Sequence, residues 1–156
     1  MEKTFLKIVD ENQGIIYKVC KMYRNSKEDQ EDLFQEIVLQ LWKAFPNFRQ
    51  ESKASTWMYR IALNTAMLIF RKKKIELDFK ETIPANIYPK NYDEPSENEE
   101  RMFEAFRTLN EAERAIIALF LEDYSYKEIA QITGATENNV GVKISRIKEK
   151  LKKILN

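Results

Sequence analysis

The stretch from Ser125 to Lys153 decides the fold of this chain, and it reads SYKEIAQITGATENNVGVKISRIKEKLKK. Ser125 and Glu128 have the spacing of a capping box, in which the hydroxyl accepts from a backbone N–H at the helix start and the carboxylate accepts from the N–H of the cap residue. Gly134 then supplies the positive φ that ends a helix within one residue. Thr136 can cap a second helix directly afterwards. The stretch therefore predicts a helix, a tight turn and a second helix.

The predicted second helix has one apolar and one polar side. Apolar residues recur at three- and four-residue steps and form a stripe that we expect to be buried. They are Val140, Ile144, Ile147, Leu151 and Ile154. The outward side carries amides near the helix start and cations further along, namely Asn138, Asn139, Lys143, Arg146, Lys150 and Lys153. Amides suit base edges and cations suit phosphates, which is typical of a DNA-binding helix-turn-helix, although an ordinary helical hairpin with a solvated charged face also fits this spacing.

The composition favours an all-α protein and excludes several kinds of metal site and catalytic site. The chain has 156 residues with only three Gly and four Pro, and residues that favour helices are abundant. There is no His, and Cys20 is the only Cys, which excludes Cys/His zinc sites, catalytic pairs with His and an internal disulfide. The carboxylates lack a partner in any recognisable catalytic spacing. We therefore expect no enzyme activity, no cofactor and no metal, and a core position for Cys20.

The sequence also gives an expectation for the location of the protein. No apolar run approaches the roughly 20 residues that a membrane span needs. The start, Met-Glu-Lys-Thr, lacks the pattern of a signal peptide. We therefore expect a cytoplasmic protein without membrane insertion.

Charge divides the chain into three blocks. Residues 1–74 carry 14 Lys+Arg and 9 Asp+Glu (+5), residues 75–113 carry 4 and 11 (−7), and residues 114–156 carry 8 and 5 (+3). Two basic blocks separated by an acidic one predict two surfaces for a polyanion, with a segment between them that a polyanion repels. A solvated linker explains the charge of the acidic block equally well.

The chain is expected to form two small helical domains. Residues 75–98 contain three of the four Pro, are rich in acids and lack a sustained period, so we interpret them as a linker. The linker joins a domain at 1–74 to a domain at 99–156 that ends in the helix-turn-helix. In the second domain, a helix is expected from about Glu99, and Asn110 with Glu113 has the spacing to cap another.

In the first domain, an opening helix or helix pair precedes a helix from Glu28 that stops at Pro46. One side of that helix is widely apolar, and the other carries Asp32, Gln35, Glu36 and Gln40. On periodicity alone, simple solvation explains this polar side best.

A polar loop from Pro46 to Ser55 follows, with Phe48 among the cations Arg49 and Lys53. Such an aromatic can hold an unstacked base, but from the residues alone a plug of the core is the simpler interpretation. Ser55 or Thr56 is expected to cap the next helix, whose inward residues are Trp57, Met58, Ile61, Ala62, Thr65, Leu68 and Ile69. This helix ends in Arg71-Lys72-Lys73-Lys74, a cation cluster that suits phosphates and also any helix C-terminus.

Taken together, these motifs resemble the extracytoplasmic-function (ECF) group of the bacterial sigma-70 family, the promoter-specificity subunits of RNA polymerase. The first match runs through EDLFQE (31–36), LW (41–42), FR (48–49), TWMYRIA (56–62) and Asn64. The second runs through LNE (109–111), ER (113–114), YSYKEIA (124–130), Gly134 and residues 140–151. Both occur in order with a linker between them, so the resemblance covers nearly the whole chain.

The resemblance implies a role for each surface. Asp32, Gln35 and Glu36 would face the β′ clamp helices of core RNA polymerase, with the β subunit as a further partner. The downstream promoter element would be bound and opened by Phe48, Arg49, Lys53, Trp57, Arg60, Asn64, Arg71 and Lys72. The upstream element would be recognised in its major groove by Asn138, Asn139, Lys143 and Arg146. The acidic linker would follow the RNA exit path, and an anti-sigma factor is a further candidate partner.

The chain departs from the family pattern at two places. Gly141 and Val142 stand where many members carry a cation and a small hydroxyl residue, so the resemblance implies no base code for this helix. Leu68 and Ile69 stand where an Asp and an aromatic residue are frequent. An alternative function from the residues is a stand-alone helix-turn-helix regulator that binds DNA without core polymerase.

Overall fold

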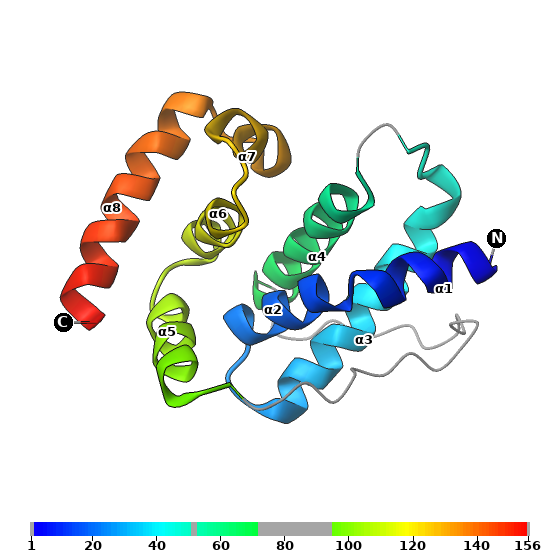
Figure 1. Ribbon diagram of the computed structural model, residues 1–156, viewed down its shortest axis with the longest axis horizontal. Helices are drawn as coiled ribbons and strands as arrows, with labels where there is room; N and C mark the ends of the chain where they lie inside the picture. Colours follow the sequence, from blue (N-terminus) through cyan, green and yellow to red (C-terminus); the bar gives the residue numbers. More distant parts are fainter. Residues whose placement is uncertain (1, 51–52, 72–94, 156) are drawn as a thin grey trace. The chain divides into compact units, whose positions relative to one another are not determined.

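The computed structural model describes residues 2–50, 53–71 and 95–155, which form eight α-helices and one short 3-10 turn (Figure 1). The chain divides into two compact units, residues 1–92 and 93–156. The prediction of an all-α fold is confirmed. Among the described helices, none combines the length and the apolar character that crossing a membrane requires. Most of the predicted linker, residues 75–94, lies outside the described part.

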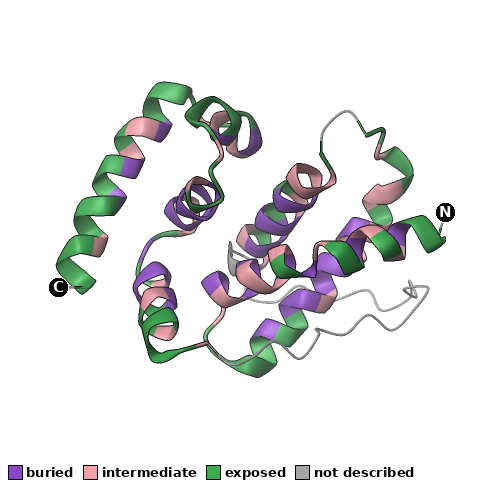
Figure 2. Cartoon of the chain, viewed as in Figure 1, coloured by how far each residue is buried: buried purple, intermediate pink, exposed green. Residues whose placement is uncertain are grey.

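The first unit is built on three helices that pack against one another. Its elements are α1 (Glu2–Glu11), α2 (Gln13–Tyr23), α3 (Lys27–Ala44), η1 (Phe45–Asn47) and α4 (Ala54–Arg71). Helices α2, α3 and α4 each contact the other two, and Figure 2 shows buried residues along their facing sides. The largest fully buried side chains of the unit are Phe5, Ile16, Met22, Phe34, Ile37, Leu41, Met58 and Leu63. Cys20 is also buried, as predicted.

Helix α4 differs from its prediction at its start and on its inward side. It begins at Ala54, so Ser55 and Thr56 lie inside the helix and do not cap it. The reason is that the carbonyl of Lys53 already accepts the first helical hydrogen bond, from the N–H of Trp57 at 3.1 Å. Leu68 was expected to be buried but is 48% exposed.

Five aromatic side chains connect α1, the end of α3, η1 and the start of α4. The ring centroid of Phe5 lies 5.0 Å from that of Trp42 and 5.3 Å from that of Phe45. Phe45 in turn lies 6.2 Å from Trp57, and Phe48 stacks on Trp57 at 4.5 Å with an interplanar angle of 20°. Aromatic pairs at these separations contribute roughly 0.5–1.5 kcal/mol beyond the area they bury. The cluster therefore anchors the loop that follows α3.

In the second unit, one long helix packs against three shorter ones. The elements are α5 (Glu97–Arg107), α6 (Glu111–Leu121), α7 (Tyr126–Thr133) and α8 (Glu137–Leu155), and α8 contacts the other three. Helix α5 begins two residues before the expected Glu99, because the Ser96 hydroxyl caps it by accepting from the Glu99 N–H at 3.2 Å. Its end is fixed to α6 by the buried Arg114, whose Nη2 donates to the Arg107 carbonyl at 2.6 Å.

The predicted caps of this unit are confirmed. Complete capping boxes join Asn110 with Glu113 and Ser125 with Glu128. The Thr136 hydroxyl accepts from the N–H of Asn139 at 3.2 Å before α8 begins. Gly134 ends α7 with a φ of +79°. Each of these caps forms between residues three or four positions apart, so the turn of the helix-turn-helix is determined by short-range interactions.

The buried stripe of α8 is shorter than predicted. Val140, Ile144 and Ile147 are buried, whereas Ile154 is 47% exposed. Helix α8 has 19 residues, while α5 and α6 have 11 each. At about 1.5 Å per residue, α8 is roughly 28 Å long against roughly 16 Å for each of the two shorter helices. The covered part of the apolar stripe thus ends before the C-terminal turn of this long helix.

Gly134 gives a direct test of the turn. A Cβ at this position would meet nothing within 4 Å, so a substitution is disfavoured only by the positive φ. We expect Gly134→Ala to lower the free energy of unfolding by about 1–2 kcal/mol. Gly134→Asn should lose less, because Asn tolerates the left-handed region. Amide hydrogen exchange in α7 and α8 measures the effect; equal losses for Ala and Asn would contradict this explanation.

Candidate nucleic-acid interfaces

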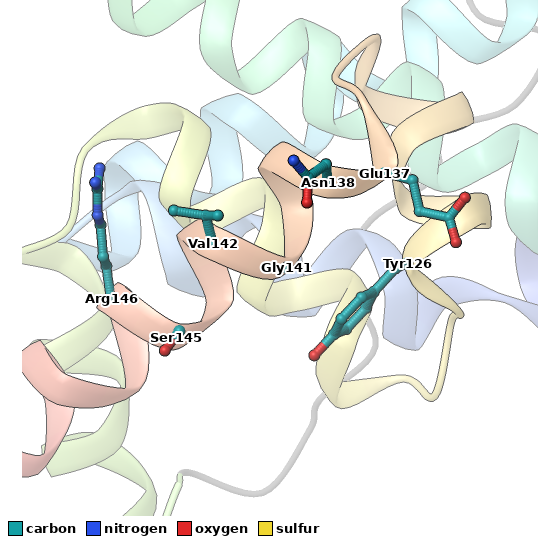
Figure 3. Close-up of a pocket in the computed structure, with 7 residues that line it drawn as sticks. All are labelled: Tyr126, Glu137, Asn138, Gly141, Val142, Ser145 and Arg146. Atoms are coloured by element: carbon teal, nitrogen blue, oxygen red, sulfur yellow. The ribbon is translucent and has the colours of Figure 1, made fainter.

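The outward side of α8 presents three residues one helical turn apart. Asn138, Val142 and Arg146 are all exposed, and helical geometry places them opposite the buried Val140 and Ile144. Figure 3 shows these side chains leaving the same side of the helix. Asn138 and Arg146 were predicted from the sequence, whereas Val142 was not. A ridge that combines an amide, an apolar group and a cation can meet base edges and a phosphate.

An open depression lies beside this ridge. It is lined by Tyr126, Glu137, Asn138, Gly141, Val142, Ser145 and Arg146 (Figure 3). Only Asn138 and Arg146 of this set were sequence-predicted site residues. Tyr126 comes from the first position of α7, 15 positions before Gly141, so the depression joins both helices of the helix-turn-helix.

Gly141 explains how the Tyr126 ring reaches α8. A Cβ at Gly141 would lie 3.3 Å from Cε2 and 3.6 Å from Cδ2 of Tyr126. Glycine inside a helix is disfavoured by roughly 1 kcal/mol relative to alanine. Here the missing side chain lets the aromatic ring lie close to the α8 backbone. Tyr126 is 40% exposed, and Val142, the residue after Gly141, is 44% exposed.

Asn139 and Lys143 lie elsewhere on α8. Neither lines the depression, and Lys143 is only half-exposed. Helical spacing places both on the side of α8 that also carries Lys150. Lys150 Nζ donates a hydrogen bond to the Glu113 carboxylate at 2.7 Å, so this side is the flank toward Glu113. The charge of Lys143 also acts on Glu113. The four predicted upstream residues therefore divide into an outward pair, Asn138 with Arg146, and a flanking pair, Asn139 with Lys143.

Glu113 connects the start of α6 to α8. Burial of its carboxylate raises the pKa, but the hydrogen bonds from Lys150 and the Asn110 backbone, with the charges of Lys150 and Lys143, lower it by more. The pKa of Glu113 is therefore held below its ordinary value of 4.5. The ionised form is the one that stabilises the fold. The same residue completes the capping box of α6, so one side chain holds two helices.

In the first unit, α3 presents only part of its predicted polar face to solvent. Asp32 is exposed and Gln35 is half-buried, but Glu36 is only 9% exposed. The Glu36 carboxylate accepts from Gln40 Nε2 at 2.9 Å. The expectation of an exposed Glu36 is wrong, because Glu36 and Gln40 lie along the edge of the apolar side next to Leu33. Asp32 and Gln35 lie on the far side.

The loop after η1 and helix α4 form a second polar surface. Arg49 and Lys53 are exposed, whereas Phe48 and Trp57 are half-buried and stacked on each other. Along α4, Arg60 and Asn64 are exposed one turn apart. Leu68 is exposed one turn further along the same line, which explains why it is not in the core.

Two predicted downstream residues cannot be placed. Lys72 and the side chain of Arg71 lie outside the described residues. Within residues 2–50, 53–71 and 95–155, no group of three or more His, Cys, Asp or Glu side chains is arranged to hold a metal ion.

The two units match two different regions of one protein family. Residues 8–75 match the family model for sigma-70 region 2, and residues 99–151 match that for sigma-70 region 4. The ECF RNA polymerase sigma factor SigW of Bacillus subtilis is 26% identical over 168 residues, covering 99% of this chain and 90% of SigW. RNA polymerase sigma factor SigV of the same organism is 30% identical over 141 residues, covering 89% of this chain and 82% of SigV. This chain belongs to the ECF group of the sigma-70 family.

The fold of this sigma factor has also been seen in a solved structure. RpoE of Bartonella quintana, solved in complex with the anti-sigma factor NepR, is similar with a TM-score of 0.75 and 22% identity, covering 98% of this chain and 97% of RpoE. The resemblance of the sequence motifs to the ECF group is thus confirmed. The chain is an RNA polymerase sigma factor that binds core polymerase and directs promoter-specific initiation. The alternative of a stand-alone regulator is not favoured.

Sequence reasoning missed part of the sigma factor's α8 surface. Tyr126 and Val142 were not among the predicted contacts, because an exposed aromatic and an exposed valine carry no charge signal. Gly141 was the available sign: a glycine inside an amphipathic helix indicates that another group approaches the backbone closely. Its partner, Tyr126, could not be identified without the fold.

The Glu113 interaction predicts a pH-dependent stability. At neutral pH, Glu113→Gln should lower the free energy of unfolding by roughly 1 kcal/mol, at the low end for a charged hydrogen bond because Lys150 is half-exposed. The pKa of Glu113 in the folded protein is below 4.5. The extra free energy of unfolding of the wild type over the variant is therefore fully present above pH 4.5, and it disappears as the pH falls through the folded pKa. Urea unfolding at a series of pH values measures both variants.

A matched control is Glu149→Gln, which removes the same charge at an exposed position of α8. Glu149→Gln should leave the pH dependence of the free energy of unfolding almost unchanged. A wild-type advantage over Glu113→Gln that is the same at pH 7 and pH 3 would contradict the role of the ionised carboxylate.

Proposed function

We propose that this sigma factor divides its work among three surfaces: α3 docks on core polymerase, the Phe48 loop with α4 binds and opens the downstream promoter element, and α8 recognises the upstream element. The observation that carries this proposal is the exposed polar ridge of α8, held outward by a buried apolar stripe. We further propose that the two domains are residues 1–74 and 99–156, joined by the acidic segment 75–98. The protein acts in the cytoplasm as a binding subunit without catalysis of its own.

The α3 surface supports docking through Asp32 and Gln35. Both lie on the side of α3 away from the apolar core. Glu36, being buried and bonded to Gln40, would act by fixing the edge of this surface rather than by direct contact. The partner surface would be the β′ clamp helices, with the β subunit contacting the protein elsewhere.

The downstream surface has two features that support strand opening, a group of exposed cations and a stacked aromatic pair. Arg49, Lys53 and Arg60 are exposed cations that can bind phosphates of a separated strand. Phe48 and Trp57 form a stacked aromatic pair beside them. An extruded base costs a few kcal/mol, which stacking on an aromatic face can offset. Asn64 and Leu68 would extend the surface along α4, and the resemblance assigns Arg71 and Lys72 to the same promoter element.

Upstream recognition would use the outward pair for the bases. Asn138 can recognise an adenine edge, and Arg146 a guanine edge or a phosphate. Lys143 and Asn139, on the flank beside Glu113, are better placed for the sugar-phosphate backbone. We also propose an anti-sigma factor as a partner, since the structurally similar RpoE was solved with one.

The need for core polymerase gives the main test. Each basic surface carries few cations, so the free protein should bind DNA weakly, and this binding should weaken further as salt rises. Docking on core should fix the separation of the two domains and raise their joint affinity. We expect sequence-specific binding only with core enzyme, measured by titration of the 156-residue protein against promoter fragments selected with the reconstituted holoenzyme.

The docking surface is tested in the same titration. Asp32→Ala should weaken holoenzyme formation by about fivefold, or roughly 1 kcal/mol, without loss of folding because the apolar side of α3 is untouched. Glu11→Ala, an exposed carboxylate at the end of α1, is the matched control and should bind core normally. Tight, specific DNA binding by the free protein together with normal docking of Asp32→Ala would refute the proposal.

Strand opening is tested at Phe48. Phe48→Leu keeps apolar bulk against Trp57 but removes the flat ring that a base could stack on, which is worth roughly 1–3 kcal/mol per base. We expect permanganate reactivity of promoter thymines to fall while duplex binding and thermal stability persist. Unchanged reactivity would leave Phe48 as a packing residue, the simpler interpretation from the sequence.

A further inference from the structure

We propose that Tyr126, Gly141 and Val142 form an apolar notch that accepts the 5-methyl group of a thymine in the upstream element. This inference rests on the proposed role of α8 and names a specificity determinant within it. Thymine is the only DNA base with a methyl group in the major groove, and proteins recognise it by apolar contact. The notch would thus select a T·A pair with thymine on one particular strand.

The geometry of the notch supports an apolar occupant. Val142 is 44% exposed on the outward ridge, so its methyl groups are available to a ligand. The Tyr126 ring lies on the other side of Gly141, where a Cβ would be only 3.3 Å from Cε2. Gly141 adds no side chain between them. Figure 3 shows Val142 and the Tyr126 ring on opposite sides of Gly141, and both side chains line the depression together with polar ones.

The polar residues around the notch favour a base edge over a phosphate. Glu137 lines the same depression as Tyr126, and its negative charge would repel a phosphate there. Asn138 and Arg146 lie on the ridge one turn before and one turn after Val142. They can form hydrogen bonds to the neighbouring base pairs while the methyl group fills the space between them. An exposed valine at the centre of a polar ridge is explained by this contact.

The test uses reconstituted holoenzyme and an upstream element selected from random duplexes. Each thymine of the element, on either strand, is replaced in turn by deoxyuridine, which removes only the methyl group. At one position the wild-type affinity should fall about fourfold, as expected for one buried methyl-sized group. The Val142→Ala holoenzyme should bind the thymine and uracil duplexes alike at that position, whereas Val142→Ile should still prefer thymine.

A second variant tests the opposite wall of the notch. Gly141→Ala adds a Cβ 3.3 Å from Tyr126 Cε2, so the ring has to move by a few tenths of an ångström. It should reduce the preference for thymine over uracil, although alanine favours the helix more than glycine does. If Gly141→Ala remains fully helical but no longer prefers thymine over uracil, the loss comes from recognition and not from unfolding.

The outcomes distinguish this inference from the proposed function. If wild-type holoenzyme selects an upstream element but tolerates uracil at every thymine, the notch is refuted and the role of α8 stands. If Val142→Ala keeps the full thymine preference, another residue makes the contact and the notch is also refuted. If the holoenzyme selects no upstream element at all, the proposed function of α8 fails, and this inference fails with it.

Discussion

The burial of Val140, Ile144 and Ile147 against α5, α6 and α7 fixes the rotation of α8 about its own axis. Full burial of each such side chain is worth roughly 1.5–3 kcal/mol, so turning α8 far enough to expose all three would remove most of the stability of a small helical unit. With this rotation fixed, Asn138, Val142 and Arg146 have to face outward. The recognition surface is thus a consequence of the core.

Other interactions fix where α8 lies along its neighbours. Glu113 caps α6 and binds Lys150 on α8, while Lys148 Nζ lies 4.7 Å from the centre of the Phe120 ring on α6. Gly141 lets Tyr126 lie against α8 from the α7 side. These contacts are individually modest, but they act on different sides of the helix. Together they hold the ridge in one orientation, which lowers the cost of ordering it on DNA.

Much of the fold could be predicted because its signals are local. The boxes at Ser125 and Asn110 and the turn at Gly134 each depend on residues within four positions, and all three are present. The contact of Tyr126 with Gly141 spans 15 positions and the Glu113–Lys150 pair spans 37, so neither could be predicted from spacing. Glu36 and Leu68 both lie at the edge of the apolar side of their helices, and Glu36 is buried there whereas Leu68 is exposed. Periodicity gives the two sides of a helix but does not decide which residues at their boundary are buried.

The central claim, that the outward ridge of α8 meets the upstream element in the holoenzyme, is tested most directly by tethered cleavage of DNA. Cys20 is the only cysteine and is buried, with a pKa raised by burial, so Ser145→Cys supplies a single accessible thiol beside the ridge. An iron chelate attached there should cut the promoter in one short upstream segment, only when core polymerase is present. Scattered cleavage, or the same cleavage without core, would contradict the account.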